Sequence, residues 1–398
     1  MKQKLYSIIY ASVSVFMATM IIAFPQEVLK ASQRGLDVWA NVVFPSLLPF
    51  FIVAELLIAF GVVHFIGVLF EPVMRPLFNV PGVGGFVWTM GMASGYPSGA
   101  KFTARLREEN QLSKTEAERL VSFTNASNPL FIIGAVSIGF FHDLKLGILL
   151  AITHYTSNFL VGICMRFYKY HERNRYSTQH FSISKALSKL HRARMRDKRA
   201  LGKILGDAVT QSIQTLLVIG GFIILFSVLT EILREVQIAQ FISGGITIIL
   251  SWFQIPAEMA LPLLSGIFEI TIGANEVASA DSSTLIKAIL VSIILAFNGF
   301  SVQAQVASIL AETDIQFTPY FFARLLHGLF AGIIVTILYV PVYKNLQTTN
   351  ESVITTLAQP SVDNIQQLYL MFEQMGFIIT LSALFINLII LMKNKVRL

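Results

Sequence analysis

The chain has 398 residues, of which 54% are hydrophobic and 13% charged, and its mean hydropathy is +0.66. Soluble domains carry about 25% charged residues, and so much apolar surface cannot be hidden inside a water-soluble globule. The composition excludes soluble, disordered, collagen-like and coiled-coil proteins and indicates an all-α polytopic membrane protein. A single cysteine excludes an internal disulfide. The net charge of +7 resembles a nucleic-acid signal, but it is concentrated in one loop.

Apolar segments of about 20 residues, the length that crosses a bilayer as a helix, predict eight membrane spans. They are residues 5–24, 37–60, 117–141, 144–167, 207–231, 284–310, 319–340 and 368–392. The first apolar run is too long for a signal peptide and lacks a cleavage site, so we interpret it as a retained anchor.

Four further apolar segments do not look like full spans. Residues 62–78 are broken by two prolines and two charged side chains, and residues 82–101 and 256–280 are rich in small and polar residues. Residues 238–253 are short and either lie at the interface or cross. A crossing would invert everything that follows, so we prefer the interfacial position.

The basic residues set the orientation. Residues 166–203 hold twelve of the 30 Lys and Arg residues, and loops rich in these residues stay in the cytoplasm. Eight crossings then place both termini in the cytoplasm and the polar loop 343–367 outside it. Part of residues 182–203 is expected to lie as a helix on the inner leaflet. The loop would also suit nucleic acid, but its role in topology explains its charge and no nucleic-acid partner is expected.

Two halves of the sequence repeat one pattern. Residues 37–48 resemble 207–217, residues 123–127 resemble 297–301, and His154 matches His327, at offsets between 170 and 174. Each copy contains a long helix, a short interfacial piece, a Gly-rich hairpin, a helix broken by polar residues and a final helix. A re-entrant hairpin adds no crossing, so each copy crosses three times and the second is inverted. This arrangement is typical of secondary transporters.

The predicted organisation follows from these repeats. It comprises an anchor helix (1–34), the first repeat (35–168), a basic cytoplasmic loop (169–204), the second, inverted repeat (205–341), an extracytoplasmic polar loop (342–367) and a final transmembrane helix (368–398).

The first hairpin supplies the first group of candidate substrate-binding residues. Gly permits tight turns, Pro ends a helix, and backbone N–H groups freed beside a helix N-terminus favour an anion. The alternative is a packing seam of small residues. The candidates are Ser94, Gly95, Tyr96, Pro97, Ser98, Gly99 and Lys101.

Polar residues interrupt two apolar segments at matching positions, and we predict that they also bind substrate rather than only joining helices. They are Asn125, Ser127 and Asn128 in the first repeat, and Asn298, Ser301 and Gln303 in the second. Arg324 lies early in a span. It either extends to the cytoplasmic surface or pairs with an anionic substrate or with Glu269.

The second hairpin carries candidates for ion or proton coupling. Carboxylates at membrane depth are costly unless they are paired or protonated, which singles out Glu269 and Glu276, with Thr271 and Asn275 beside them. His154 and His327 either relay protons or are simply hydrogen bonded. Phosphate-loop, catalytic and metal-binding motifs are not found. We expect no enzyme activity, no metal site and no cofactor beyond a coupling proton or cation.

These residues carry a resemblance. The hairpin 91–101, the segment 123–129 and the duplicated pattern resemble the Gate, or nucleoside-recognition, domain. Within it they resemble the YlbJ, or SpoVV, family of sporulation integral membrane proteins of endospore-forming bacteria. The resemblance implies a carrier that moves dipicolinic acid from the mother cell across the outer forespore membrane. It is also compatible with a homo-oligomer, since related nucleoside carriers are trimers.

The implied substrate is a flat pyridine with two carboxylates, which hydroxyl, amide and backbone N–H groups would hold while Tyr96 or Phe123 stacks on the ring. Lys101 would serve as an entry charge. Nucleoside carriers of this fold use hairpin carboxylates, which the first hairpin lacks. Two alternatives stay open, namely a carrier of another small solute such as a nucleoside, and a non-transporting sporulation scaffold that acts through the basic loop.

Overall fold

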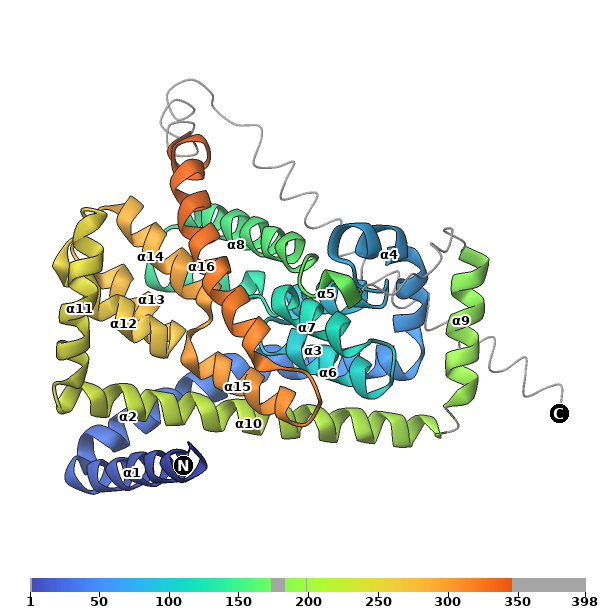
Figure 1. Ribbon diagram of the computed structural model, residues 1–398, viewed down its shortest axis with the longest axis horizontal. Coiled ribbons are helices and arrows are strands. Elements are labelled where there is room, and N and C mark those ends of the chain that lie inside the picture. Colours follow the sequence, from blue (N-terminus) through green and yellow to red (C-terminus); the bar gives the residue numbers. More distant parts are fainter. Residues whose placement is uncertain (1, 173–182, 198, 346–398) are drawn as a thin grey trace, which may run out of the picture. The chain divides into compact units, whose positions relative to one another are not determined.

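The computed structural model describes residues 2–172, 183–197 and 199–345. The predicted final helix 368–392, nearly all of the polar loop 343–367 and part of the basic loop lie outside these residues. The described residues up to Tyr343 form one compact unit. Every regular element in the described ranges is a helix (Figure 1), so the all-α prediction is confirmed.

The first repeat has the predicted order of elements. It follows α1 (Lys2–Ala23), α2 (Pro25–Val38) and a π-helical stretch (Trp39–Val43) that leads directly into α3. Its elements are α3 (Phe44–Ala59), α4 (Val62–Phe78), the hairpin of α5 (Gly84–Ser94) and α6 (Ser98–Glu108), the broken pair of α7 (Lys114–Thr124) and a π-helix (Leu130–Phe140), and α8 (Leu144–Met165).

The second repeat shows the same order after a connecting helix, α9 (Ile183–Arg196). Its α11 has 15 residues, fewer than a span needs, as the interfacial interpretation expects. The elements are α10 (Leu201–Glu235), α11 (Ile238–Trp252), the hairpin of α12 (Ala260–Phe268) and α13 (Ile270–Ser279), the broken pair of α14 (Thr284–Phe297) and α15 (Gly299–Ala311), and α16 (Phe317–Leu338). Figure 1 shows α10 running along α2 and α15.

Among the described residues, four helical stretches are long and apolar enough to cross a membrane: Leu144–Met165, Leu201–Glu235, Thr284–Ala311 and Phe317–Lys344. Two pairs, Ser7–Ala23 with Pro25–Asn41 and Leu47–Ala59 with Val62–Phe78, are bent by 104° and 85° and raise the number to six if each is one span. Eight crossings stay a prediction. Residues 117–141 are divided by an unwound segment, and the last predicted span lies outside the described residues.

Residues 62–78 form α4, the short element expected between the long helix and the hairpin, and this helix runs through both prolines. Its two charged side chains form an ion pair one turn apart, with 2.8 Å between Arg75 Nε and Glu71 Oε1. Arg75 also lies 2.7 Å from Glu116 on α7, and Glu71 accepts a hydrogen bond from the backbone N–H of Gly82. The charges therefore attach α4 to the first hairpin and to α7 instead of ending the helix.

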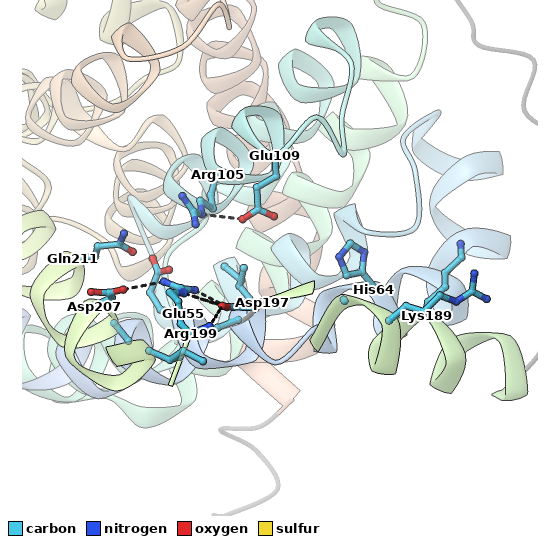
Figure 2. A pocket seen from close by; sticks show the side chains of 15 residues that line it. Glu55, His64, Arg105, Glu109, Lys189, Asp197, Arg199, Asp207 and Gln211 are labelled. Carbon is cyan, nitrogen blue, oxygen red and sulfur yellow. Dashed lines mark hydrogen bonds and ion pairs between the residues drawn. The ribbon is translucent and has the colours of Figure 1, made fainter. Parts of the chain in front are cut away.

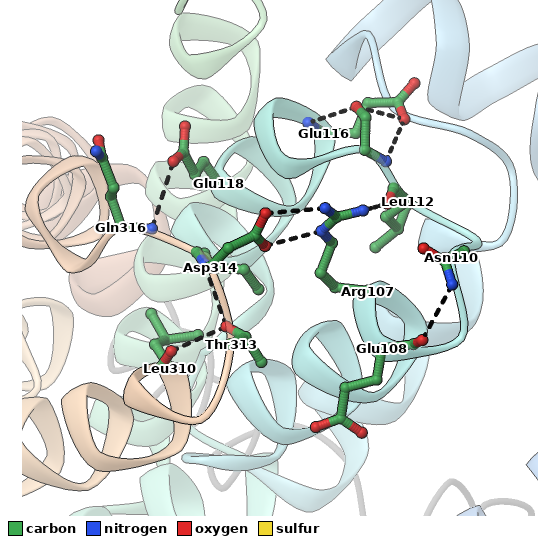
Figure 3. A network of polar contacts seen from close by, with 12 residues as sticks. Arg107, Glu108, Asn110, Leu112, Glu116, Glu118, Leu310, Thr313, Asp314 and Gln316 are labelled. Carbon is green, nitrogen blue, oxygen red and sulfur yellow. Dashed lines mark hydrogen bonds and ion pairs between the residues drawn. The ribbon is translucent and has the colours of Figure 1, made fainter.

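A second polar network joins the two repeats (Figure 3). Arg107 at the end of α6 donates two hydrogen bonds of 2.9 Å to Asp314, which lies between α15 and α16. These bonds hold the pKa of Asp314 below its ordinary value. Beside them, Glu118 of α7 accepts a hydrogen bond from the backbone of Gln316 and pairs with Lys169 at 3.0 Å. The first hairpin and α7 are thus attached to the loop that precedes α16.

Glycines let the first hairpin touch the broken helix. A side chain at Gly91 or at Gly99 would overlap the carbonyl oxygen of Thr124, and a Cβ at Gly99 would also lie 2.7 Å from the backbone nitrogen of Asn125. The second hairpin closes on itself in the same way, with Gly273 against Gly266. The structure therefore supports the interpretation that Gly91 and Gly99 belong to a packing seam of small residues.

We expect Gly99→Ala to lower the melting temperature of the purified protein, because overpacking against a rigid backbone costs about 1–3 kcal/mol. The matched control is Gly221→Ala on α10, where a Cβ meets no atom within 4 Å. There the better helix propensity of Ala adds up to about 1 kcal/mol. Thermal unfolding in detergent measures both. Equal melting temperatures for the two variants would contradict the close approach of hairpin and break.

Candidate functional site

Four interruptions of the helices meet around one cavity of about 770 Å³. Two are the hairpin tips, at Gly95–Pro97 and at Glu269, and two are the helix breaks at 125–128 and at Asn298. Gly95 and Asn298 have positive φ angles of 85° and 74°, which Gly and Asn tolerate better than most residues. Each interruption, or the turn of helix beside it, contributes side chains to the cavity wall.

The cavity wall combines a polar side with an apolar side. The polar lining residues include Asn41, Ser94, Tyr96, Ser127, Asn128, Glu269, Thr271, Ser301 and Gln305. The apolar lining includes Leu47, Leu130, Phe131, Phe140, Ile219, Ile223 and Val302. A largely apolar cavity with a few convergent polar groups suits a small ligand that has an apolar body and polar substituents.

Glu269 is the only charged residue among the described residues that line this cavity. It is 5% exposed and lies in extended backbone between α12 and α13, where its Oε2 accepts a 2.8 Å hydrogen bond from the backbone N–H of Ile272. Glu269 thus caps the N-terminus of α13 and faces the cavity at the same time. Near it along the wall, the buried Ser301 hydroxyl finds no hydrogen-bond partner within the described part of the chain. It is available to a ligand.

Arg324 lies behind the cavity and is completely buried. It donates to the backbone carbonyl of Asn125 at 3.2 Å and to that of Ser122, and a further 3.2 Å bond reaches the side-chain oxygen of Asn158. These two carbonyls belong to the end of α7, where the helix leaves acceptors without partners. Arg324 therefore completes the C-terminus of α7. It does not extend to the surface, so that alternative is wrong, and no contact with Glu269 is found among the described residues.

Equivalent residues of the two repeats meet beside Arg324. The rings of His154 and His327 are 4.8 Å apart, and His327 Nε2 lies 3.1 Å from the carbonyl oxygen of His154. The hydroxyl of Tyr320 lies 2.8 Å from the amide nitrogen of Asn125 and 3.0 Å from the amide of Asn298. Such pairing of equivalent positions is expected where a two-fold axis relates two copies. It supports a two-fold relation between the repeats.

The hydrogen bonds also indicate the protonation of both histidines. His154 Nε2 accepts from the backbone N–H of Ser127 at 3.0 Å, which places its proton on Nδ1. His327 Nδ1 accepts from Arg324 at 3.0 Å, which places its proton on Nε2. Both rings are then neutral and hydrogen bonded, as the simpler interpretation of these residues expects. Their part in proton transfer stays a prediction.

The family model for Gate, described as nucleoside recognition, matches residues 40–141 and again residues 216–314. The chain belongs to the Gate family. The two Gate matches each cover a hairpin and the broken helix that follows it. The chain is also 53% identical over 392 residues to the sporulation integral membrane protein YlbJ of Bacillus subtilis strain 168, covering 97% of this chain and 96% of that protein. No solved structure matches this chain.

The Gate repeats bring eight of the predicted site residues to the cavity wall: Ser94, Gly95, Tyr96, Ser127, Asn128, Glu269, Thr271 and Ser301. Others are buried behind the wall, namely Pro97, Ser98, Gly99, Asn125, Asn298, Gln303, Arg324, His154 and His327. Three lie elsewhere. Lys101 is 3.2 Å from Glu55, Glu276 is paired with Arg234, and Asn275 is exposed. Ligand contact and ion coupling by these residues stay predictions.

The sequence analysis did not predict several residues that line the cavity or lie beside it. Asn41, Gln305, Phe131 and Phe140 line the cavity, and Glu55 is the partner of Lys101. Asn41 and Glu55 are polar or charged residues inside the predicted span 37–60, which is a signal for function. The aromatic residues carried no such signal, because an apolar span is expected to contain them.

We expect Arg324→Met to lower the melting temperature clearly. It leaves buried acceptors at the end of α7 unpaired, and each such acceptor costs about 1–3 kcal/mol. Leu329→Met is the control, since Leu329 lies on the same helix with 59% of its surface exposed. Thermal unfolding in detergent compares the two proteins. Equal melting temperatures for Arg324→Met and the wild type would show that Arg324 does not stabilise the interrupted end of α7.

Proposed function

We propose that the chain is a secondary carrier that moves dipicolinate from the mother cell across the outer forespore membrane during sporulation. The proposal adds a substrate and a membrane to what the comparisons give, which is a Gate-family protein similar to a sporulation integral membrane protein. In this proposal the substrate crosses chemically unchanged, so the chain is not an enzyme. Both termini and the basic loop face the mother-cell cytoplasm.

One observation carries the proposal: four interrupted helical segments from two repeats line a single cavity. Interrupted helices at membrane depth are tolerated where they are buried in protein or line a water-filled cavity. Secondary transporters place their binding sites between repeats at such helices. A membrane scaffold needs no cavity with convergent polar groups, so the scaffold alternative accounts for less of the structure.

The cavity suits an aromatic dicarboxylate in two respects. Phe131, Phe140 and Tyr96 offer rings against which a flat heterocycle can stack. Ser301 offers a free hydroxyl, and hydrogen bonds to carboxylates are among the stronger ones that a neutral donor makes. Arg324 contributes no side-chain surface to this cavity, so the proposal does not depend on it as a ligand.

Glu269 links the proposal to an energy source. A dianion beside an ionised Glu269 in a largely apolar cavity would be strongly repelled. A proton or a cation bound at Glu269 removes this repulsion, so the carrier takes up substrate together with the coupling ion. Thr271 lies next to Glu269 on the wall and supplies a second oxygen for that ion.

The second candidate is a carrier of another small solute such as a nucleoside. The description of the matched family as nucleoside recognition favours it. Competition between dipicolinate and uridine for transport in proteoliposomes separates the two candidates. Transport of uridine that dipicolinate does not inhibit would overturn the dipicolinate assignment.

We expect Ser301→Ala to weaken dipicolinate transport about ten- to a hundredfold. Loss of a hydrogen bond to a charged group costs about 1.5–3 kcal/mol, and each 1.4 kcal/mol is a factor of ten. The measurement is initial uptake of radiolabelled dipicolinate into proteoliposomes at low concentration. Thr336→Ala is the control, because the Thr336 hydroxyl is exposed and bonds only within its own helix. Equal uptake by the two variants would remove Ser301 from the site.

We expect Glu269→Gln to abolish the response of dipicolinate uptake to an imposed gradient of the coupling ion, while exchange of dipicolinate for dipicolinate continues. The amide keeps the shape of the side chain but neither gains nor loses a proton. Uptake is measured with and without a pH gradient and a sodium gradient. A variant that still responds to the gradient like the wild type would show that another group carries the ion.

A further inference from the structure

The cavity of about 770 Å³ described above is here called the central cavity. Two further cavities adjoin it. The nearer one, here called the middle cavity, measures about 290 Å³ and shares Ile219 and Gln305 with the central cavity. The farther one, the outer cavity, measures about 530 Å³ and shares Glu55, Arg105 and Gln211 with the middle cavity. Each cavity therefore lies next to the following one, and the side chains that line both stand between them.

The outer cavity lies at the basic segment of the chain (Figure 2). Lys189 and Arg192 of α9 line it together with Arg199 and with Arg105 of α6. Segments so rich in Lys and Arg stay in the cytoplasm, so the outer cavity opens on the side from which the proposed substrate comes.

Four acidic residues, Glu55, Glu109, Asp197 and Asp207, also line the outer cavity and equal these four cations in number. Arg199 pairs with Asp197 at 2.7 Å and with Asp207 at 2.9 Å, and its hydrogen bonds lower the pKa of Asp197 to about 2. Arg105 pairs with Glu109 at 3.0 Å. Arg192, by contrast, donates to the hydroxyl of Ser188 and keeps its charge for a passing anion.

The middle cavity contains a buried ion pair at the base of the first hairpin. Lys101 Nζ lies 3.2 Å from Glu55 Oε1, and the two side chains are 13% and 8% exposed. The ammonium group also lies 4.6 Å from the centre of the Phe51 ring. Within the described residues it has no hydrogen bond of good geometry, although an ammonium group can donate three.

A buried pair of this kind contributes little to stability, because removing both charges from water costs about as much as their attraction returns. Its position gives it another use. Lys101 stands one helical turn beyond the hairpin tip whose residues line the central cavity, and its charge faces the cavity through which an anion must pass.

We propose that the three cavities form one entry route for carboxylate anions, with Lys101 as an intermediate carboxylate-binding site at which the substrate takes the place of Glu55. The inference rests on the proposed carrier function and adds a second site to it. Glu55 competes with the substrate, so a carboxylate binds at Lys101 only briefly and moves on to the central cavity. Rapid passage requires such weak binding at each step.

The test uses charged thiol reagents, so that it does not depend on dipicolinate. The chain has one cysteine, Cys164, which is replaced by serine, and Ser301→Cys places a thiol in the central cavity. Inside-out vesicles expose the basic face to a sulfonate-bearing or a trimethylammonium-bearing methanethiosulfonate. The rate of modification of residue 301 is measured for each reagent.

We expect Lys101→Met to lower the rate at which the anionic reagent modifies residue 301 about tenfold relative to the rate for the cationic reagent. Glu55→Gln is expected to raise the rate for the anionic reagent. Lys145→Met, at the start of α8, is the control and leaves the ratio unchanged. The double variant Glu55→Gln/Lys101→Met leaves no unpaired charge, so it replaces the single variant if that one does not fold. It too is expected to slow the anionic reagent.

The proposal that Lys101 is an entry site would be overturned if the ratio of the anionic to the cationic modification rate were unchanged in both Lys101→Met and Glu55→Gln/Lys101→Met. This outcome is separate from failure of the carrier proposal, which the uptake of radiolabelled dipicolinate decides. Charge-selective access together with absent dipicolinate uptake would retain the route and reject the substrate.

Discussion

Backbone that unwinds at membrane depth needs hydrogen-bond partners from within the protein, and the rest of this structure depends on how that need is met at the break after α7. Arg324 reaches across from α16 of the second repeat and binds the carbonyl oxygens of Ser122 and Asn125 in the first. A neutral side chain with fewer donors would leave acceptors unpaired. The break is thereby stabilised by a residue that lies about 200 positions later in the chain.

The same contact explains why the cavity lies where it does. Arg324 completes α7 from α16, and Ser127 and Asn128 of the same break line the cavity. The second repeat provides its own break at Asn298 and its own hairpin tip at Glu269. Because equivalent residues of the two repeats meet next to Arg324, the interrupted segments of both repeats converge at one place.

Much of this arrangement was predictable from the sequence. The duplicated pattern, the hairpins and the polar breaks follow from Gly, Pro and Asn in apolar surroundings, and eight predicted residues line the cavity. The role of Arg324 was not predictable. A charged residue early in a span fits either a surface position or a ligand contact, and only the fold shows that carbonyl groups of another repeat surround it. The partners of the charges in α4 were not predictable for the same reason, since they lie on α7 and the first hairpin and are distant in sequence.

We propose that the cavity between the four interrupted segments binds an aromatic dicarboxylate. Equilibrium binding of radiolabelled dipicolinate to the purified full-length protein tests it most directly, with uridine and benzoate as competitors. We expect saturable binding of one dipicolinate per chain, weak displacement by benzoate, which has one carboxylate, and none by uridine. Absence of saturable dipicolinate binding, or full displacement by uridine, would contradict it.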